Sequence, residues 1–220
     1  MSVVASPPVK PALRERYDRR REEVVGLAAR TFAERGFHAT SMQDLVEATG
    51  LTAGGLYHYI GSKDRLLVAI CDQLMAPLLE RVEEIEAAGG PADEQLRAIV
   101  RAWTAHVEEY RHHMRVFQQE RHVLERGEQW RDVRRQRKAF EEVLRGLLER
   151  GERDGTMHFD DRGLALRALL GMVNHTVQWF RPRGRLTAEQ VADGYLALMG
   201  VRPVGRLPAD DRAATLPDPR

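Results

Sequence analysis

The segment between Gly36 and Leu67 constrains the fold more than any other part of the chain. Ser41, with Asp44 three residues later, forms a capping-box pattern that predicts the start of a helix. Gly50 supplies the left-handed backbone that ends such a helix in a tight turn, and Thr52 can cap a second helix directly afterwards. The segment therefore predicts two short helices joined by a tight turn. In this helix-turn-helix arrangement the second helix can enter the major groove of DNA.

This segment resembles the N-terminal domain of the TetR family of bacterial repressors. The matching positions are Phe32, Arg35, Gly36, Phe37, Thr40, Leu51, Thr52, Gly54, Leu56, Tyr57, Ser62, Lys63, Asp64 and Leu66. Two positions depart from the family pattern. Tyr59-Ile60 stands where members often carry His-Phe, and Gly55 occupies a recognition-helix position that often holds a side chain. Because Gly55 presents no side chain to a base edge, the resemblance implies sparse base readout by this helix.

Residues on and beside the second short helix are the candidate DNA contacts. The resemblance carries phosphate contacts to Tyr57 and Lys63, whose phenol and ammonium can reach phosphate oxygens from a helix edge. Thr40 and Ser41 offer a hydroxyl and a backbone amide near the start of the first short helix, although simple capping explains them equally well. The remaining candidates are the recognition-helix positions Thr52, Ala53, Gly54 and His58.

Gly54 and Gly55 are adjacent in the recognition helix. Each glycine costs a helix roughly 1 kcal/mol relative to alanine. Such a cost makes sense where the backbone must come close to DNA. The alternative for Gly55 is that it relieves crowding within the protein.

The composition fits a globular DNA-binding protein with charge placed unevenly along the chain. Of the 220 residues, 43% are hydrophobic and 30% charged, and the formal net charge is only +1. The basic residues Lys10, Arg14, Arg16, Arg19, Arg20 and Arg21 nevertheless face only two acidic neighbours in the same stretch, Glu15 and Asp18. By itself this run predicts a solvated helix face. Beside a helix-turn-helix, it favours arginines that neutralise phosphates or enter a minor groove.

Cysteine usage and hydropathy indicate a cytoplasmic protein without a membrane segment. The single cysteine, Cys71, excludes an internal disulfide and suits a reducing compartment. No run of about 18 apolar residues predicts a membrane span, and the N-terminus lacks the apolar core of a signal peptide.

Apolar residues recur with helical spacing through most of the chain, and no useful stretch alternates with the period of a strand. We expect an all-α fold with a three-helix DNA-binding domain over residues 13–61. A bundle of about six helices over 62–201 should bind a ligand and dimerise. Residues 1–12 and 202–220 are expected to be disordered. The expected helices are 13–35, 41–49, 52–60, 62–86 with a kink at Pro77, 92–110, 111–126, 127–150, 160–180 and 187–199, with a turn at 151–155.

The C-terminal part resembles one branch of the TetR family at lower specificity. The stretches 116–121 and 168–199 look like regulators of fatty-acid or steroid-ring degradation that respond to acyl-CoA thioesters. The Trp, Arg, Pro and Gly of that branch fall on Trp179, Arg181, Pro182 and Gly184. Leu170 and Asn174 stand where steroid-type members can carry a cationic and a large aromatic side chain. This departure favours a different acyl group.

The branch resemblance implies a mostly apolar pocket between helices, with a few polar groups that orient the ligand. The candidate ligand-binding residues are Trp103, His106, Phe117, Arg121, Asn174, Trp179 and Arg181. Of these, Arg121 and Arg181 are the candidates to hold the phosphates of coenzyme A. The alternative for Arg121 is a salt bridge within the bundle, and aromatic side chains at helical spacing are equally typical of a core.

Metal binding and catalysis are both disfavoured. The set His106, His112, His113, Glu120 and His122 contains no HxxxH pair and has no cysteine beside it, so we predict neither a metal nor a cofactor. The chain also lacks a GxSxG, a P-loop, a dinucleotide-binding fingerprint and paired cysteines. The sequence therefore does not predict an enzyme.

Assembly is expected to be two-fold, because a palindromic DNA site requires a two-fold protein. The helices at 160–180 and 187–199 carry more apolar residues than one inward face needs, which predicts a homodimer interface containing Leu169, Val173 and Leu196. The sequence thus predicts a repressor that binds a palindromic operator and is released by a small apolar effector, an acyl-CoA being favoured. The alternative is the same fold with a drug-like or free fatty acid effector, or with none.

Overall fold

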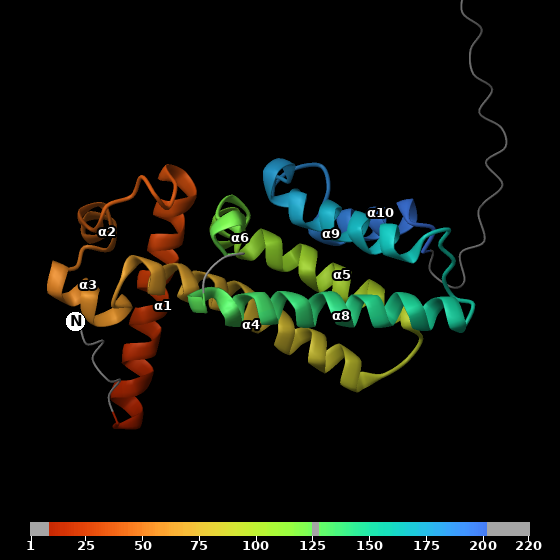
Figure 1. The fold of residues 1–220 in the computed structure, drawn as a ribbon, viewed down its shortest axis with the longest axis horizontal. Helices are drawn as coiled ribbons and strands as arrows, with labels where there is room; N and C mark the ends of the chain where they lie inside the picture. The colour runs from red at the N-terminus through yellow and green to blue at the C-terminus, as the bar shows by residue number, and fades with distance from the viewer. Residues whose placement is uncertain (1–8, 125–127, 202–220) are drawn as a thin grey trace, which may run out of the picture.

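The computed structural model describes residues 9–124 and 128–201, and in those residues every regular element is a helix (Figure 1). The elements are α1 (Pro11–Arg35), α2 (Met42–Thr49), α3 (Ala53–Ile60), α4 (Lys63–Ala88), α5 (Ala92–Glu109), α6 (Arg111–Gln119), α7 (Arg121–Leu124), the 3-10 helix η1 (Glu128–Trp130), α8 (Arg131–Arg153), α9 (Arg162–Trp179) and α10 (Ala188–Leu198). The predicted all-α class is confirmed. Within the described ranges, no helix has the length and apolar character that crossing a membrane would need.

Helices α1 to α3 form the head, and their ends lie where the capping pattern predicts them. The Ser41 side chain accepts a hydrogen bond from the Asp44 amide while the Asp44 carboxylate accepts one from the Ser41 amide, which completes the capping box. Gly50 ends α2 at φ 64°, in the left-handed region. Thr52 then accepts a hydrogen bond from the Gly55 amide at the start of α3. The helix-turn-helix prediction is confirmed.

The first helix begins two residues earlier than predicted. Pro11 occupies its first turn, where the missing amide hydrogen has no intrahelical partner to lose and the fixed φ suits a helix. The predicted disordered arm 1–12 therefore overlaps α1 at its end, and residues 1–8 of that arm lie outside the described residues, as does the predicted tail 202–220.

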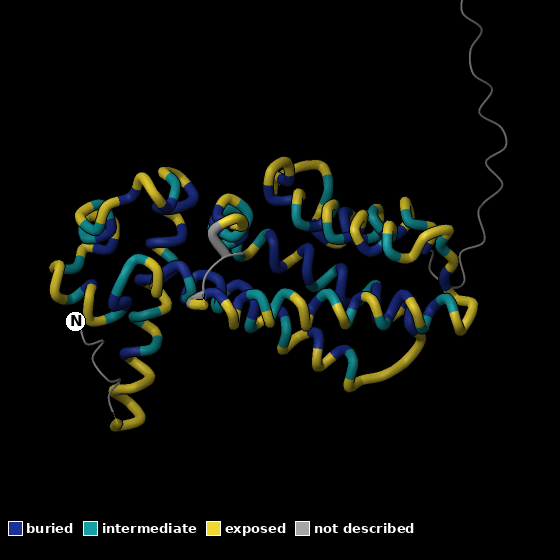
Figure 2. Tube along the Cα trace, viewed as in Figure 1, coloured by how far each residue is buried: buried dark blue, intermediate teal, exposed yellow. Residues whose placement is uncertain are grey.

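Helices α4, α5, α8, α9 and α10 form the bundle around the largest hydrophobic core. Helix α5 lies at its centre and packs against each of the other four. Its buried face is formed by Leu96, Ile99, Val100, Trp103 and Val107. Figure 2 shows this inner face of α5 and α8 as buried while the outer turns of the bundle are exposed. Helix α4 runs through Pro77 as one continuous helix.

The segments between α5 and α9 differ from the predicted boundaries. The predicted helix 111–126 is divided into α6 and α7, and the predicted helix 127–150 extends to Arg153 as α8 after the short η1. The predicted turn at 151–155 therefore begins too early. Gly151 is buried inside α8, and the Met157 side chain packs where a β-carbon at this position would lie. Gly151 thus allows a close approach within the helix and does not end it.

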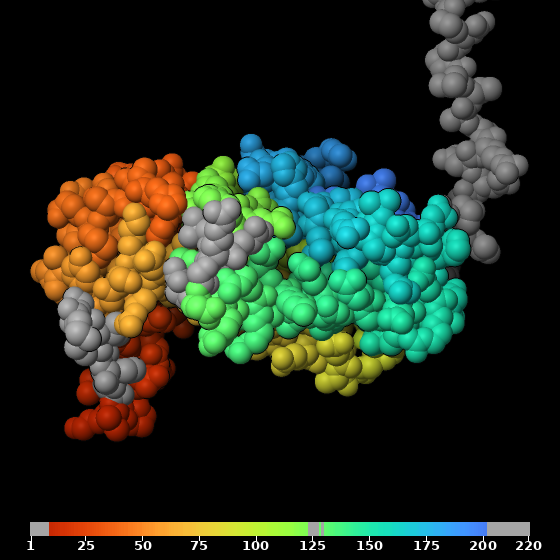
Figure 3. All heavy atoms as spheres, in the orientation of Figure 1, coloured from red at the N-terminus to blue at the C-terminus, as the bar shows by residue number. Residues whose placement is uncertain are grey.

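The head and the bundle share hydrophobic contacts across the predicted boundary at residue 61. The core of the head contains Phe32, Leu45 and Leu56, and also Val116 from α6, Trp130 from η1 and Val133 from α8. Helix α1 packs against α6, and Figure 3 shows the head in contact with one end of the bundle. We call this set of contacts the seam. It fixes the head on the bundle through buried apolar surface.

The predicted dimer residues lie elsewhere than expected. Leu169, Val173 and Leu196 are all 0% exposed and belong to the core of their own bundle. They cannot form a surface between chains, so this prediction is wrong. The surplus of apolar residues on α9 has a simpler cause, because α9 packs against α5, α6, α8 and α10 of the same chain. The large apolar side chains left on the surface of α9 and α10 are Leu164, Trp179 and Leu198.

Candidate DNA interface and ligand cavity

Helix α3 presents an exposed face formed by the predicted DNA-contact residues. Thr52, Ala53, Gly54, Tyr57 and His58 are all exposed. A β-carbon on Gly54 would meet no atom within 4 Å. A β-carbon on Gly55, by contrast, would lie 3.3 Å from the Thr52 hydroxyl oxygen that caps the helix. Gly55 is therefore explained by crowding within the protein, whereas Gly54 leaves open space on the outer face.

The position of α3 is set by an aromatic contact from α1. The Tyr17 ring stacks on Tyr59 with a centroid separation of 5.1 Å and meets the His58 ring edge-on at 5.5 Å. The Tyr17 hydroxyl also donates a hydrogen bond to the His58 carbonyl at 3.4 Å. Aromatic pairs of this kind contribute about 0.5–1.5 kcal/mol beyond their buried area. The first helix thus supports the exposed face of α3 from behind.

Thr40 is not part of an exposed surface. Its side chain is 2% exposed and its hydroxyl donates to the Gly36 carbonyl at 2.7 Å. The predicted hydroxyl contact is therefore wrong for Thr40. Ser41 is exposed, but its hydroxyl donates to the Asp44 carboxylate at 2.6 Å. This hydrogen bond, together with that from the Ser41 amide, lowers the pKa of Asp44.

Lys63, the first residue of α4, lies beside the loop between α1 and α2. Its ammonium donates to the Thr40 carbonyl at 2.8 Å and to the His38 carbonyl at 3.5 Å. It also lies 4.6 Å from the centre of the Phe37 ring. A lysine ammonium has three donors, so a phosphate contact is compatible with these two carbonyls. Lys63 thus has a structural role, and its phosphate contact stays a prediction.

The basic residues at the start of α1 are interleaved with acidic ones. Arg14 pairs with Asp18 at 3.0 Å and Arg20 pairs with Glu23 at 2.7 Å. These pairs are exposed, and such pairs contribute little to stability. Figure 1 shows the first turns of α1 projecting from the head. The arginines can therefore exchange their carboxylate partners for phosphates at small cost.

A cavity of about 680 Å³ lies within the bundle. Apart from the His106 imidazole, its buried lining is apolar and consists of Leu74, Met75, Leu78, Trp103, Val107, Met114 and Phe140. The exposed lining residues mark its mouth: Arg121, Arg167, Gly171 and His175, with the half-buried Arg137 and Glu141 beside them. The cavity is thus apolar inside and predominantly cationic at its opening.

The predicted ligand-binding residues divide into two groups. Trp103, His106, Phe117, Arg121 and Asn174 line the cavity. Trp179 and Arg181 do not line it. They are exposed at the C-terminal end of α9, where the Arg181 carbonyl accepts a hydrogen bond from the Gly184 amide at 2.8 Å in a turn. The predicted motif from Trp179 to Gly184 therefore contains a turn here and does not line the cavity.

Several cavity residues escaped the sequence analysis. Arg137 lies one turn before Phe140 and Glu141 on α8, and Arg167 lies seven residues before Asn174 on α9. Helical spacing from the predicted Asn174 would have found Arg167, whereas α8 held no predicted ligand position from which to find Arg137. Gln118, which follows Phe117, also lines the cavity and donates a hydrogen bond from its amide nitrogen to the Asn174 carbonyl.

Phe117 connects the cavity with the head. Its ring packs against the core of the bundle and against the core of the head, and it lines the cavity. The Arg137 guanidinium lies 5.5 Å from the ring centre. The neighbouring Val116 is fully buried in the head core. A change in the cavity at Phe117 therefore acts directly on the seam.

Burial lowers the pKa values of two histidines near the cavity, His106 and His113. The His106 imidazole donates to the Leu74 carbonyl at 2.6 Å, and its ring stacks on Tyr110 at 4.3 Å. Burial lowers the pKa of His106. Burial also lowers the pKa of His113 to about 4, with the charges of His112 and His106 adding to the effect. His113 is hydrogen-bonded to the Gln73 amide oxygen at 2.9 Å. These side chains are polar parts of the packing.

Comparisons with known proteins match both halves of the chain. Residues 25–70 match the family described as bacterial regulatory proteins, tetR family, and residues 89–200 match the tetracyclin repressor-like C-terminal domain. The HTH-type transcriptional repressor KstR2 of Rhodococcus jostii (strain RHA1) is 32% identical over 181 residues, which cover 82% of this chain and 89% of that protein.

Solved structures are similar over most of their length. AibR in complex with isovaleryl coenzyme A and operator DNA has a TM-score of 0.74 at 30% identity, covering 83% of this chain and 98% of that chain. The TetR family transcriptional regulator PfmR from Thermus thermophilus has a TM-score of 0.72 at 34% identity, covering 83% of this chain and 99% of that chain.

Proposed function

The chain belongs to the TetR family of bacterial regulatory proteins, and we propose that it is a transcriptional repressor that binds a palindromic operator as a homodimer and responds to an acyl-CoA thioester. The observation that carries the proposal is that α6 serves both the head and the cavity. Its Val116 is part of the head core, and its Met114 and Phe117 line the cavity. A ligand in the cavity would therefore contact the same helix that packs against the DNA-binding head.

The coupling needs only a difference in affinity. A ligand shifts the head between two arrangements by as much as its affinity for the two differs, typically 1–3 kcal/mol in allosteric proteins. Ligand atoms that pack against Phe117 change the contacts of a residue that also packs in the seam. The exposed face of α3 belongs to the same head. A shift of the head would therefore change the distance between the two α3 helices of a dimer.

The chemistry of the cavity supports an acyl-CoA effector. Its apolar interior suits an acyl chain, which gains about 0.8 kcal/mol per buried methylene. Its mouth carries Arg121, Arg137 and Arg167 against Glu141, and arginines form strong charge-assisted hydrogen bonds with phosphates. The volume of about 680 Å³ lies within the range of roughly 300–1,000 Å³ typical of ligand pockets. The similar AibR is described in complex with isovaleryl coenzyme A.

The effect of the ligand on operator binding is the finer part of the proposal. We propose that the effector releases the operator. The AibR complex contains isovaleryl coenzyme A and operator DNA together, so the assay has to register a gain as well as a loss of DNA affinity.

A regulator with this head works beside chromosomal DNA in the cytoplasm. Its relatives are named as regulators, which supports a role without catalysis.

The dimer would form through α9 and α10 with different residues from those predicted by the sequence. Leu164 on α9 is 62% exposed and Leu198 on α10 is 80% exposed. Ala168 on α9, and Gly194 and Ala197 on α10, are exposed as well, and such small residues let two helices approach closely. We propose this surface as the interface of the homodimer.

Removing the charge of Lys63 should weaken operator binding. Lys63→Ala removes one phosphate contact, so the slope of log affinity against log salt should flatten by about one unit. Its thermal midpoint should also fall, because the carbonyls of Thr40 and His38 lose their donor. Fluorescence anisotropy on an operator fragment over a salt series measures the slope. Lys138→Ala, which removes an exposed charge on α8, is the matched control, and an unchanged slope for Lys63→Ala would contradict the phosphate contact.

Gly54→Ala should change stability and DNA affinity in opposite directions. Its β-carbon meets no atom within 4 Å, so the helix gains stability by up to about 1 kcal/mol. The added methyl group occupies the face turned toward DNA, and operator affinity should fall about tenfold, or roughly 1.4 kcal/mol. Gly146→Ala on α8, also without a neighbour within 4 Å, should be stabilised without losing DNA affinity. Full operator affinity in Gly54→Ala would show that DNA does not approach this backbone.

Acyl-CoA thioesters should bind with an affinity that rises with acyl length. Each methylene buried in the cavity should strengthen binding about fourfold until the cavity is filled, and free CoA should bind poorly. Calorimetry, run beside operator-release assays, measures this series. Arg137→Ala and Arg167→Ala should weaken the thioesters, whereas Arg181→Ala, outside the cavity, should not. If a free fatty acid or a planar drug releases the operator while no acyl-CoA binds, the effector assignment fails and the repressor remains.

The wild-type protein should have about twice the 25.1 kDa mass of one chain in light scattering. Leu164→Arg or Leu198→Arg places a charge on the proposed interface and should give a folded monomer. Leu169→Arg places a charge in the core and should prevent folding. Leu13→Arg, at an exposed leucine on α1, is the control that should remain dimeric. A monomeric wild type would contradict the homodimer, and dimeric Leu164→Arg and Leu198→Arg variants would contradict this interface.

A further inference from the structure

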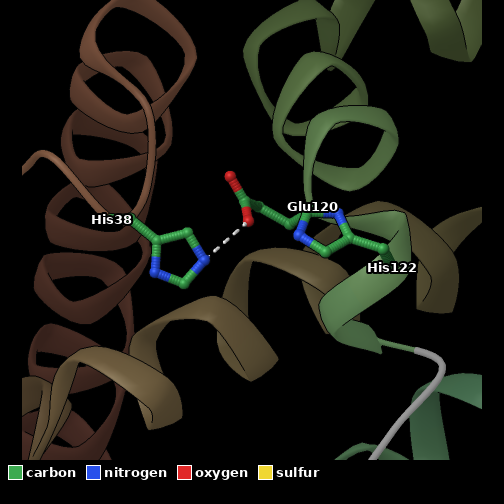
Figure 4. Close-up of side chains that lie close together, drawn as sticks. All are labelled: His38, Glu120 and His122. Carbon is green, nitrogen blue, oxygen red and sulfur yellow. Dashed lines mark ion pairs between the residues drawn. The ribbon is translucent and has the colours of Figure 1, made fainter.

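Three side chains with metal-binding atoms meet where the head contacts the bundle. His38 lies in the loop between α1 and α2, Glu120 follows the last residue of α6, and His122 lies in α7. One ligand atom of each lies within 4.8 Å of the other two. The shortest printed separation joins the His38 Nε2 and the Glu120 Oε2 at 3.6 Å, and Figure 4 shows the three side chains converging from the two sides.

The Glu120 carboxylate in this group lacks a hydrogen-bond donor for one of its oxygens among the described residues. Glu120 is only 6% exposed, and its Oε2 is buried without a hydrogen-bond partner among the described residues. The 3.6 Å separation from His38 is too long for a hydrogen bond. A buried carboxylate without a donor is costly, and such an atom in a folded protein requires an explanation. The same oxygen is oriented toward the two imidazoles, where a cation would satisfy it.

We propose that His38, Glu120 and His122 bind a divalent transition-metal ion, with zinc as the ion of first choice. Two imidazole nitrogens and one carboxylate oxygen are a donor set that zinc accepts with water in the fourth position. At zinc–ligand distances of about 2.0–2.2 Å, neighbouring ligands of a tetrahedral site are about 3.4 Å apart. His38 and Glu120 are already near that separation, and the exposed His38 and His122 rings can rotate to complete it.

The ion would connect the two parts of the molecule at a second point besides the apolar seam. His38 precedes α2 by a few residues, and its carbonyl is held by Lys63. Glu120 stands at the end of the helix whose Phe117 lines the cavity. A metal bridge between them would restrict how the head moves relative to α6. By thermodynamic linkage, metal affinity and operator affinity would then change each other by the same factor. This inference does not depend on which ligand fills the cavity.

Zinc titration of the chelator-treated, full-length protein tests the site directly. Calorimetry against a competing chelator should give one high-affinity ion per chain, and the thermal midpoint should rise when zinc is added, because the ion binds only the folded arrangement. Cobalt, as a spectroscopic substitute, should give visible absorption bands of a tetrahedral site. Zinc should also slow amide exchange in residues 36–41 and 119–122, which report the connection between the head and α6.

Variants assign the ion to these residues. His38→Ala and His122→Ala change exposed side chains, so both variants should fold. Both should lose the cobalt bands and bind zinc at least about tenfold more weakly, because mutation of residues that only support metal ligands already has effects of this size. Glu120→Gln should fold without zinc at least as stably as the wild type and should gain no stability from zinc. His158→Ala, at an exposed histidine outside the group, is the matched control.

Two results would overturn the proposal. One is the absence of any zinc-induced change in heat, thermal midpoint or amide exchange at up to about 100-fold molar excess of zinc over the protein. At such an excess even a weak site would be occupied by mass action. The other is zinc binding of equal strength in the wild type, His38→Ala and His122→Ala, which would assign the ion to other histidines. If Glu120→Gln does not fold, the two histidine variants alone decide between these outcomes.

Discussion

The structure depends on the buried apolar seam that attaches the DNA-binding head to the bundle. Val116, Trp130 and Val133 are inserted from the bundle into the same core that contains Phe32 and Leu56 of the head. Their removal from water contributes roughly 1.5–3 kcal/mol for each large side chain, so the head has one strongly preferred position. The orientation of α3 is consequently a property of the whole chain, and the bundle can influence DNA binding without touching DNA.

One polar group near this seam has the opposite character, because it leaves an interaction incomplete. The Lys63 ammonium is bound by the carbonyls of Thr40 and His38, whereas the Glu120 carboxylate beside His38 has a buried oxygen without a donor among the described residues. An apolar seam provides stability but little response to solutes, whereas an unsatisfied carboxylate responds to any cation that reaches it. The two together give a junction that is stable and still adjustable.

Local signals in the sequence predicted the elements well, and tertiary placement was harder. Ser41, Thr52 and Thr187 mark helix starts because a cap is a contact between residues three apart. Leu169 was assigned to an interface because hydrophobic character alone does not tell which neighbour covers a helix face. Glu120 and His122 were weighed as metal ligands from the sequence and disfavoured, because their third neighbour, His38, comes from a segment far away in the chain and spacing rules detect only neighbours on one element. Arg167 was within reach of helical spacing from Asn174, whereas no predicted ligand position on α8 led to Arg137.

Because Phe117 lines the cavity and also packs against the head, the size of a ligand would affect the position of the head. A ligand that packs against the ring without moving it adds contacts to the present arrangement of α6 and α1 and stabilises the head where it is. A ligand whose apolar part exceeds the cavity of about 680 Å³, and which does not extend through the mouth, would displace the ring. Because interiors are close-packed, that displacement is transmitted to Val116 and the seam. If the effector is an acyl-CoA, as proposed, one cavity could thus hold a short acyl group while the protein is bound to DNA and release the operator with a longer one. The sign of regulation would then follow from ligand volume, with no change in the residues that bind it.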